Sequence, residues 1–105
     1  MAKVFVDGRN VQRSQWPNLS DEELVRRVEA WAARNGHEAV VVFDGEAPAG
    51  AIGSGHESAD DWLIRELSQH PRAWLVTSDR ALRDAAGAEA DRIIGGGGFL
   101  KELGK

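Results

Sequence analysis

Four short, uninterrupted runs of apolar residues constrain the fold of this chain more than any other feature of its sequence. Each run consists only of branched aliphatic and aromatic residues, without the alternating polar residues of a half-exposed strand. Continuous runs of this length are typical of strands that are covered on both faces, as in a parallel sheet. The four runs are residues 4–6, 40–43, 74–76 and 93–94.

Amphipathic patterns with helix boundary signals separate these runs. The first pattern begins with a capping box, in which Ser20 is followed three residues later by Glu23, and it ends at Gly36. A run of four glycines precedes the last and shortest pattern. The expected helices span residues 20–36, about 58–69, 78–87 and 99–103.

The order of these elements alternates between strand and helix along the chain. Such alternation predicts an α/β fold, a three-layer α/β/α sandwich around a mainly parallel sheet of four or slightly more strands. With 105 residues, the chain fits one domain spanning residues 1–105. Residues 45–57 are rich in glycine and alanine without hydrophobic periodicity, and we expect a mobile loop there.

The composition excludes several classes of protein. The chain has no cysteine, so it has neither disulfide bonds nor thiolate metal sites. Its net charge of −4 argues against binding nucleic acid by overall charge attraction alone. No apolar stretch approaches the roughly 20 residues that span a bilayer, and no signal-peptide pattern begins the chain. We therefore expect a cytoplasmic protein without membrane contact, either a monomer or a homodimer.

Aspartate residues stand at the ends of three predicted strands. Asp7, Asp44 and Asp79 each follow an apolar run directly or within three residues. Because the carboxyl ends of parallel strands meet at one edge of the sheet, these side chains should gather there. A fourth carboxylate, Asp60, shares the inward face of its predicted helix with Leu63, whereas the neighbouring acid lies on the solvated face.

Several carboxylates in one crevice repel one another, and a hard divalent cation removes that conflict. Oxygen ligands without histidine or cysteine favour Mg²⁺ or Mn²⁺ over zinc. Two such ions activate a water molecule and stabilise the leaving oxygen of a phosphodiester. Each aspartate also has a simpler interpretation: Asp7 and Asp44 precede glycine as in turns, and Asp79 suits a helix N-terminus.

Four short motifs resemble those of a known group of nucleases. In chain order, VDGRN, VVFDG, ESADDWL and VTSDRAL are similar to motifs of the NYN branch of the PIN-like nuclease superfamily, and most to those of the YacP-like NYN proteins. The resemblance implies a PIN-like, Rossmann-like fold and an endoribonuclease that depends on Mg²⁺ or Mn²⁺. It implies an acidic, metal-binding and catalytic cluster of Asp7, Asp44, Asp60 and Asp79, joined by Asn10, which orients Asp7 or a phosphate.

The resemblance, and the position of several arginines near the functional edge, suggest residues that contact the substrate. Thr77 and Ser78 would supply hydroxyl groups near the cleaved phosphate, although Ser78 also suits a helix N-cap. Arg9 stands where the family has an aromatic residue, and with Arg13 and Arg80 it begins segments at the functional edge. These arginines would bind RNA phosphates, together with Asn10. Trp16, in an expected loop, would either stack an unpaired base or pack over the first helix.

The expected function is hydrolysis of single-stranded or loop RNA, with RNA as the partner and ribosome association as a family analogy. The alternative is a catalytically silent module of the same fold that binds RNA or protein. A phosphatase with an aspartyl nucleophile is disfavoured, because the second aspartate it needs is replaced by Arg9.

Overall fold

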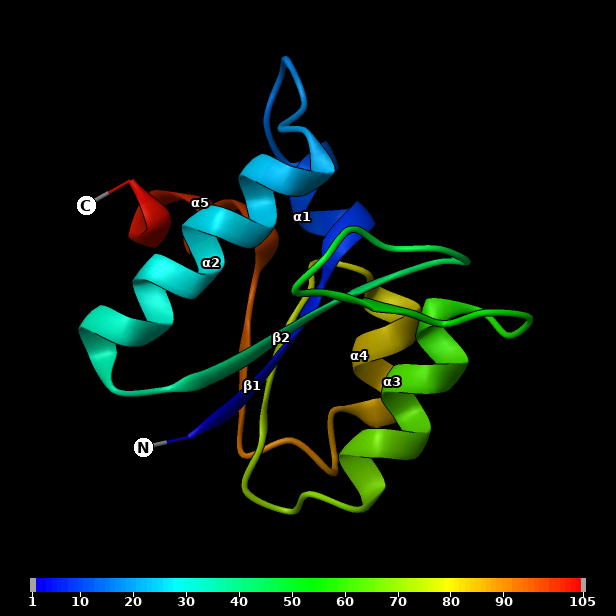
Figure 1. Ribbon diagram of the computed structural model, residues 1–105. Helices are drawn as coiled ribbons and strands as arrows, with labels where there is room; N and C mark the ends of the chain where they lie inside the picture. Colours follow the sequence, from blue (N-terminus) through cyan, green and yellow to red (C-terminus); the bar gives the residue numbers. More distant parts are fainter. Residues whose placement is uncertain (1, 105) are drawn as a thin grey trace.

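The computed structural model describes residues 2–104, which form five strands and five helices (Figure 1). Strands and helices alternate, as predicted, with one extra helix and one extra strand. Among these residues no helix is both long and apolar enough to cross a membrane. In chain order the elements are β1 (Lys3–Asp7), α1 (Gly8–Arg13), α2 (Asp21–Asn35), β2 (Glu38–Phe43), β3 (Ile52–Gly53), α3 (Ala59–Ser68), β4 (Trp74–Val76), α4 (Arg80–Ala86), β5 (Arg92–Ile94) and α5 (Gly96–Leu103).

The five strands form one entirely parallel sheet in the order β3-β2-β1-β4-β5. From the central strand β1 the chain first builds outward through β2 and β3, and then crosses to the other side to add β4 and β5. The direction of winding therefore reverses between β1 and β4. Open parallel sheets bind their ligands beyond the carboxyl ends of the strands at such a reversal.

Helices cover both faces of the sheet and enclose two separate hydrophobic cores. Figure 1 shows α2 and α5 on one side of the sheet and α3 and α4 on the other. The first core packs α1, α2 and α5 against the sheet around Val6, Val28 and Phe99. The second packs α3 and α4 against the opposite face around Phe5 and Leu63. Adjacent strand residues thus point to different cores, which explains why the runs are apolar throughout.

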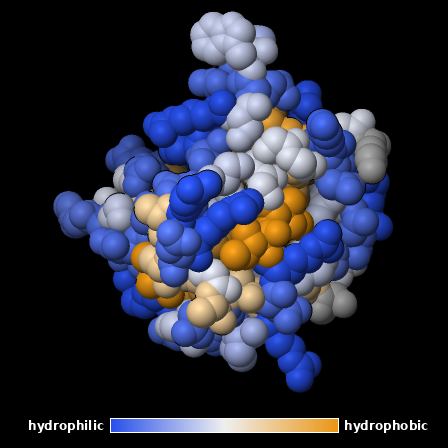
Figure 2. Space-filling model, turned by 180° about the vertical axis from the view of Figure 1, so that it is seen from behind, coloured by the Kyte–Doolittle hydropathy of each residue, from blue (hydrophilic) through white to orange (hydrophobic). Residues whose placement is uncertain are grey.

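The face seen in Figure 2 is largely hydrophilic, with a small hydrophobic patch near its middle. The helix caps that the sequence predicts for α2 are present. The hydroxyl of Ser20 accepts the Glu23 N–H at 3.1 Å, and Gly36 ends α2 in the left-handed conformation with φ of 68°. At the start of α3, the Ser58 hydroxyl accepts the Asp61 N–H at 3.0 Å.

One helix was missed, and two others begin at residues other than those predicted. Helix α1 is absent from the sequence prediction, because its six residues include Gly8 and only one aliphatic residue. Helix α5 begins at Gly96 rather than Phe99, so three glycines form its first turn. Helix α4 is capped by Asp79 and not by Ser78, since the Asp79 carboxylate accepts the Leu82 N–H.

The prediction of a loop without regular structure over residues 45–57 was also wrong in part. Ile52 and Gly53 pair with the end of β2 as strand β3. Ser54 is buried; its hydroxyl donates to the carbonyl of Glu57 at 2.7 Å and accepts the N–H of Gly45. A side chain at Gly53 would begin only 2.2 Å from the Gly45 carbonyl oxygen, so glycine is required there. Such pairing leaves no periodic signal in a sequence.

Candidate active site

The four aspartates that the sequence singled out line one cavity of about 200 Å³ at the carboxyl edge of the sheet. They arrive from four different segments: the end of β1, the end of β2, the first turn of α3 and the cap of α4. The cavity therefore lies at the reversal of strand order described above. Its lining residues are Asp7, Arg9, Asn10, Arg13, Asp44, Ser58, Asp60 and Asp79.

Asp7 is the most deeply placed of these acids, with only 6% of its surface exposed. Burial, together with the negative charges of Asp60 and Asp79, raises the pKa of its carboxyl group to about 6. Hydrogen bonds from the Thr77 hydroxyl and the Asn10 backbone act in the opposite direction. Ionisation of the Asp7 carboxyl group therefore costs free energy in the folded protein, unless a cation or another positive group compensates.

Asp60 is half-buried and faces the same cavity from the first turn of α3. Its pKa is raised by burial first, and then by the negative charges of Asp79, Asp44 and Asp61. The neighbouring Asp61 is exposed and does not line the cavity, as the helix-face argument predicted. The mutual repulsion expected from the sequence is thus present in the structure.

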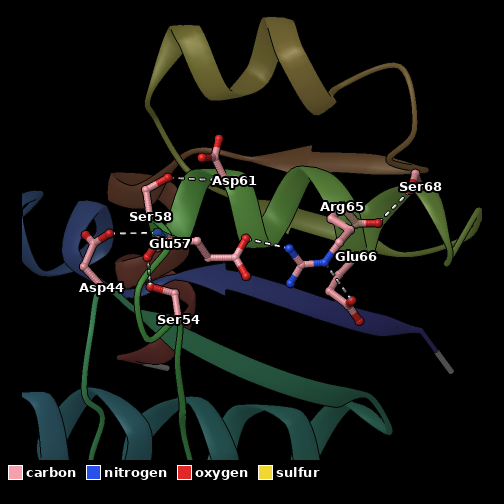
Figure 3. Close-up of polar contacts among 9 residues, drawn as sticks. Asp44, Ser54, Glu57, Ser58, Asp61, Arg65, Glu66 and Ser68 are labelled. Atoms are coloured by element: carbon pink, nitrogen blue, oxygen red, sulfur yellow. Dashed lines mark hydrogen bonds and ion pairs between the residues drawn. The ribbon is translucent and has the colours of Figure 1, made fainter.

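Asp44 is exposed at the mouth of the cavity, and one of its carboxylate oxygens has a structural role. Oδ1 accepts the backbone N–H of Ala59 at 2.7 Å, at the start of α3, as Figure 3 shows. The same view shows Glu57 directed away along the helix, where it forms an ion pair with Arg65 at 2.5 Å. Asp44 therefore joins the end of β2 to the first turn of α3.

Asp79 also has two roles: it caps α4 and it lines the cavity. Its Oδ1 accepts the Leu82 N–H at 3.2 Å, which is the helix-terminus role that the sequence offered as the simpler interpretation. A single hydrogen bond leaves its other oxygen available, as it does for Asp44. Capping and ligand binding are therefore compatible in both residues.

Thr77 is completely buried and connects two of the acids. Its hydroxyl donates to Asp7 Oδ2 at 3.0 Å and accepts the backbone N–H of Asp79 at 3.1 Å. The guanidinium of Arg83 donates to the Thr77 carbonyl at 2.9 Å. The Thr77 hydroxyl is directed at protein groups, so its position suits orienting Asp7 rather than touching a substrate.

Asn10 and Ser78 form hydrogen bonds that connect the segments following β1 and β4, on the two sides of the strand reversal. The Asn10 side-chain oxygen accepts the Ser78 N–H at 2.7 Å, and the Ser78 hydroxyl accepts the N–H of Gly96 at 2.7 Å. Ser14 closes the same corner, since a side chain at Gly96 would lie 2.4 Å from its hydroxyl oxygen. These contacts fix the ends of α1, β4 and α5 relative to one another.

The three arginines expected to bind phosphate have different surroundings. Arg9 donates to Asp21 at 2.8 Å and to Gln12 at 3.0 Å, with its guanidinium 5.0 Å from the centre of the Phe43 ring. Arg13 is exposed at the cavity and has no ion-pair or hydrogen-bond partner among residues 2–104. Arg80 is exposed outside the cavity lining.

Arg9 is held in place by residues that the sequence does not single out. Gln12 is buried, and its amide donates to Asp21 at 2.6 Å and to the Leu19 carbonyl at 3.1 Å. The hydrogen bond from Gln12, followed by that from Arg9, holds the pKa of Asp21 below its usual range. No pattern in the sequence marks these contacts, because they join α1 to the start of α2 across an irregular loop.

The chemistry of the donor set fits a hard divalent cation. The acidic side chains of the cavity offer carboxylate oxygens, and the lining contains no histidine. Burial of Asp7 beside two further negative charges leaves an electrostatic conflict that such a cation would relieve. Over residues 2–104, however, no three acidic or histidine side chains already lie close enough to one another to form a complete ligand set. Binding would require the carboxylates to draw together or water to complete the coordination.

Comparison with known structures assigns the architecture. A mutant form of Rae1 (YacP) from Bacillus subtilis superposes with a TM-score of 0.80, and the structure of unmodified Rae1 (YacP) with a TM-score of 0.75. The chain has the fold of Rae1 (YacP). Both alignments cover 99% of this chain, and 76% and 74% of the Rae1 chains, at 20% sequence identity.

The Rae1 (YacP) fold confirms the predicted α/β sandwich, and it agrees with the resemblance of the sequence motifs to those of YacP-like proteins. No protein-family model and no curated protein sequence matches the chain. At this level of identity the likeness to Rae1 concerns the fold, and the chemistry of the cavity has to be argued from its own residues.

Proposed function

We propose that this protein is an endoribonuclease that depends on Mg²⁺ or Mn²⁺ and hydrolyses phosphodiester bonds of single-stranded or loop RNA. The observation that carries the proposal is the meeting of Asp7, Asp44, Asp60 and Asp79 in one cavity at the strand reversal. The fold shared with Rae1 (YacP) supports it, since the motifs that contain these acids resemble those of YacP-like nucleases.

The metal ligands in this proposal are the four aspartates, with Asp7 at the centre. Asp44 and Asp79 each hold a helix N–H with one oxygen and retain the other. When bound, divalent ions supply an activated water and stabilise charge on the leaving oxygen of the phosphodiester. Such ions also favour the ionised form of Asp7, which burial alone disfavours.

The other residues of the cavity would position the site and the RNA. Thr77 orients the Asp7 carboxylate through its hydroxyl, and Asn10 keeps the end of β1 beside the end of β4 through Ser78. Arg13 lines the cavity with an unpaired guanidinium, as judged over residues 2–104, and is the best-placed phosphate ligand. Arg9 lines the same cavity and is held there by hydrogen bonds to Gln12 and Asp21.

The proposed substrate class follows from the size of the cavity and the charge of the chain. A hollow of about 200 Å³ admits a single strand, whereas proteins that bind duplex RNA span a wide minor groove. With a net charge of −4, affinity must come from bound metal and a local group of arginines, or from an RNA-containing partner such as the ribosome.

The decisive experiment is incubation of a mixed single-stranded RNA pool with the wild type and Asp7→Asn, in Mg²⁺, Mn²⁺ or EDTA. The proposal expects cleavage by the wild type with either metal, and none with EDTA or with the variant. Asp84→Asn is the matched control, because Asp84 is an exposed aspartate on α4 outside the cavity. Equal cleavage by wild type and Asp7→Asn would contradict the proposal.

One observation favours the alternative of a silent binding module. Asp44 and Asp79 both make helix-capping contacts, and across the described chain the acids do not already form a complete ligand set. This alternative predicts RNA binding without cleavage, and no dependence of that binding on divalent metal. The same RNA pool, assayed for binding in EDTA and in Mn²⁺, separates the two functions.

A further inference from the structure

A second hollow, larger than the acidic cavity, lies next to it. It is an open groove of about 510 Å³ between the end of α1 and one side of α5. Its lining residues are Ser14, Gln15, Gly97, Gly98, Leu100 and Lys101. Arg13 lines the acidic cavity and Ser14, the next residue, lines the groove, so consecutive residues at the end of α1 contribute to the two hollows.

Trp16 stands beside this groove, immediately after Gln15. Its side chain is 88% exposed, and it is the one exposed large hydrophobic side chain among residues 2–104. Packing over the first long helix, one of the two sequence interpretations, is therefore excluded. The loop that contains it projects at the top of Figure 1 and is also outermost when the molecule is seen from behind in Figure 2.

The base of this loop is fixed by hydrogen bonds. On one side, the Ser14 hydroxyl donates to the Asn10 carbonyl at 3.0 Å. On the other, the buried Gln12 amide donates to the carbonyl of Leu19 and to Asp21. An indole held in solvent on an anchored loop loses little conformational freedom when it binds a flat partner.

Two glycines of the groove have no explanation in packing. A side chain at Gly96 would collide with Ser14, but one at Gly97 or Gly98 would meet nothing within 4 Å. Glycine in a helix costs roughly 1 kcal/mol relative to alanine. Glycine does allow close approach of a ligand to the backbone, and the first N–H groups of a helix lack acceptors within it. Exposed backbone donors therefore line the groove.

The charge of the groove is also suited to an anionic chain. Lys101 lies in the groove, exposed and without an ion-pair or hydrogen-bond partner in the described part of the chain. With Arg13 at the end of α1, it places two unpaired cations along one path on a protein that is acidic overall. Backbone donors, cations and an exposed indole are the groups that bind single-stranded nucleic acid.

We propose that this groove and Trp16 together form a subsite for the single-stranded RNA that flanks the cleaved bond. A base stacks on the Trp16 indole, and the phosphates beside it face Gly97, Gly98 and Lys101. This subsite rests on the proposed ribonuclease function, because it is defined by its position beside the acidic cavity. It extends that function by making the enzyme bind several nucleotides on one side of the cleaved bond.

The test measures binding of a fluorescent ten-nucleotide RNA by anisotropy in Mg²⁺, with Asp7→Asn as the parent so that no RNA is cleaved. Stacking is worth about 1–3 kcal/mol per base, and 1.4 kcal/mol is tenfold in affinity. Adding Trp16→Ala should therefore weaken binding about tenfold or more, and Trp16→Phe should restore most of it. Affinities of Trp16→Ala and parent within about twofold of each other would overturn the subsite.

An abasic scan separates stacking from a general effect of the substitution. One abasic nucleotide is moved along the RNA, and the parent should lose affinity sharply at one position. In the Trp16→Ala background that loss should disappear, because the base has no indole to contact. A loss that is unchanged by Trp16→Ala would show that the base binds elsewhere.

Charge and backbone contacts have their own matched variants. Lys101→Ala should reduce the slope of log affinity against log salt by about 0.7, the value expected for one phosphate contact on a single strand. Arg72→Ala, an exposed cation just before β4 at the opposite end of the strands, should leave the slope unchanged. Gly97→Ala should raise the unfolding midpoint while weakening RNA binding. Equal slopes for Lys101→Ala and the parent would contradict the proposed path.

Failure of the subsite and failure of the proposed function give different results. Cleavage by the wild type that depends on Asp7, together with binding that is indifferent to Trp16, overturns the subsite and leaves the ribonuclease in place. Binding that depends on Trp16, without cleavage by the wild type in either metal, supports the groove and overturns the catalytic function. A parent that binds no RNA overturns the subsite.

Discussion

The hydroxyl of Thr77 donates a hydrogen bond to Oδ2 of Asp7 at 3.0 Å, between residues that lie 70 positions apart in the chain. Neither side chain is accessible enough to exchange this contact for water, because Thr77 is fully buried and Asp7 nearly so. The contact joins the carboxyl ends of the paired strands β1 and β4, where the strand order reverses. It fixes the orientation of the one acid that the fold places at the bottom of the cavity.

The stability of the metal-free protein should fall as the pH rises from about 4 to about 6. Burial raises the pKa of Asp7 from 3.8 to about 6, so in this range the folded protein binds more protons than the unfolded chain. Below pH 3.8 the group is protonated in both states, and above about 6 the loss is complete. The shift corresponds to at most about 3 kcal/mol.

Asp7→Asn should remove the loss of stability at higher pH, because its amide carries no charge and can still accept the Thr77 hydrogen bond. We expect the variant to be about 1–3 kcal/mol more stable than the wild type at pH 8 in EDTA, and equally stable near pH 4. Urea unfolding at both pH values measures the difference. Asp84→Asn, at an exposed position, should show no such pH dependence; a similar gain there would refute the assignment to Asp7.

Thr77→Val should both destabilise the fold and make Asp7 harder to ionise. The substitution removes the donor to Asp7 and the acceptor of the Asp79 N–H, at a cost of about 1–3 kcal/mol. Because the hydroxyl lowers the pKa of Asp7 against the effect of burial, its loss should raise that pKa further above about 6. NMR titration of the Asp7 carboxyl carbon in metal-free protein measures the change. Thr77→Ser should behave like the wild type; an unshifted titration in Thr77→Val would contradict the positioning role.

Divalent metal should stabilise the folded protein through the acidic cavity. At 100 times its dissociation constant, Mn²⁺ should add about 2.7 kcal/mol to the free energy of unfolding. The stabilisation by Mn²⁺ should be smaller in Asp60→Asn. It should also be smaller at pH values below about 6, where protons compete with the metal for the carboxylates. Thermal unfolding with and without Mn²⁺ provides the measurement, and Asp61→Asn is the control on the solvated face of the same helix. The same gain in Asp60→Asn as in the wild type would place the metal elsewhere.

Gly8→Ala should be destabilising, although Gly8 is helical and alanine favours helices. The new methyl group would lie 2.7 Å from an atom of the fully buried Phe43 ring and 3.0 Å from the Val42 carbonyl oxygen. Overpacking of this kind costs about 1–3 kcal/mol. Denaturant unfolding tests the value, with Gly97→Ala as the control in open space. A stabilised Gly8→Ala protein would contradict the packing around the cavity.

The fold was largely predictable because its main signals are local. Strand β4, Trp74–Val76, was predicted with its observed ends, and α2 with its observed caps, from apolar runs and capping residues alone. The common edge for Asp7, Asp44 and Asp79 followed from parallel topology, and the inward position of Asp60 from helical periodicity. Each of these inferences needs only a few neighbouring residues.

What the sequence did not reveal depends on contacts between distant segments. The hydroxyl of Ser78 was read as a helix cap, yet it accepts a hydrogen bond from Gly96, 18 residues later. The start of α5 was missed for the same reason, because glycines oppose a helix locally and this one is held against Ser14 and Asn10. Thr77 was predicted to contact the substrate, but it is fully buried and its hydroxyl donates to Asp7.

The two hydrophobic cores lie on opposite faces of the sheet, and the acidic cavity draws its walls from both layers of helices. Asn10 and Arg13 belong to α1 on the first core, whereas Asp60 belongs to α3 on the second. A ligand bound by residues of both layers would connect the two layers of helices at the open end of the sandwich. It would oppose movement of one layer relative to the other. Occupancy of the cavity should therefore slow hydrogen exchange in α1 and α3 together, even though these two helices share no core.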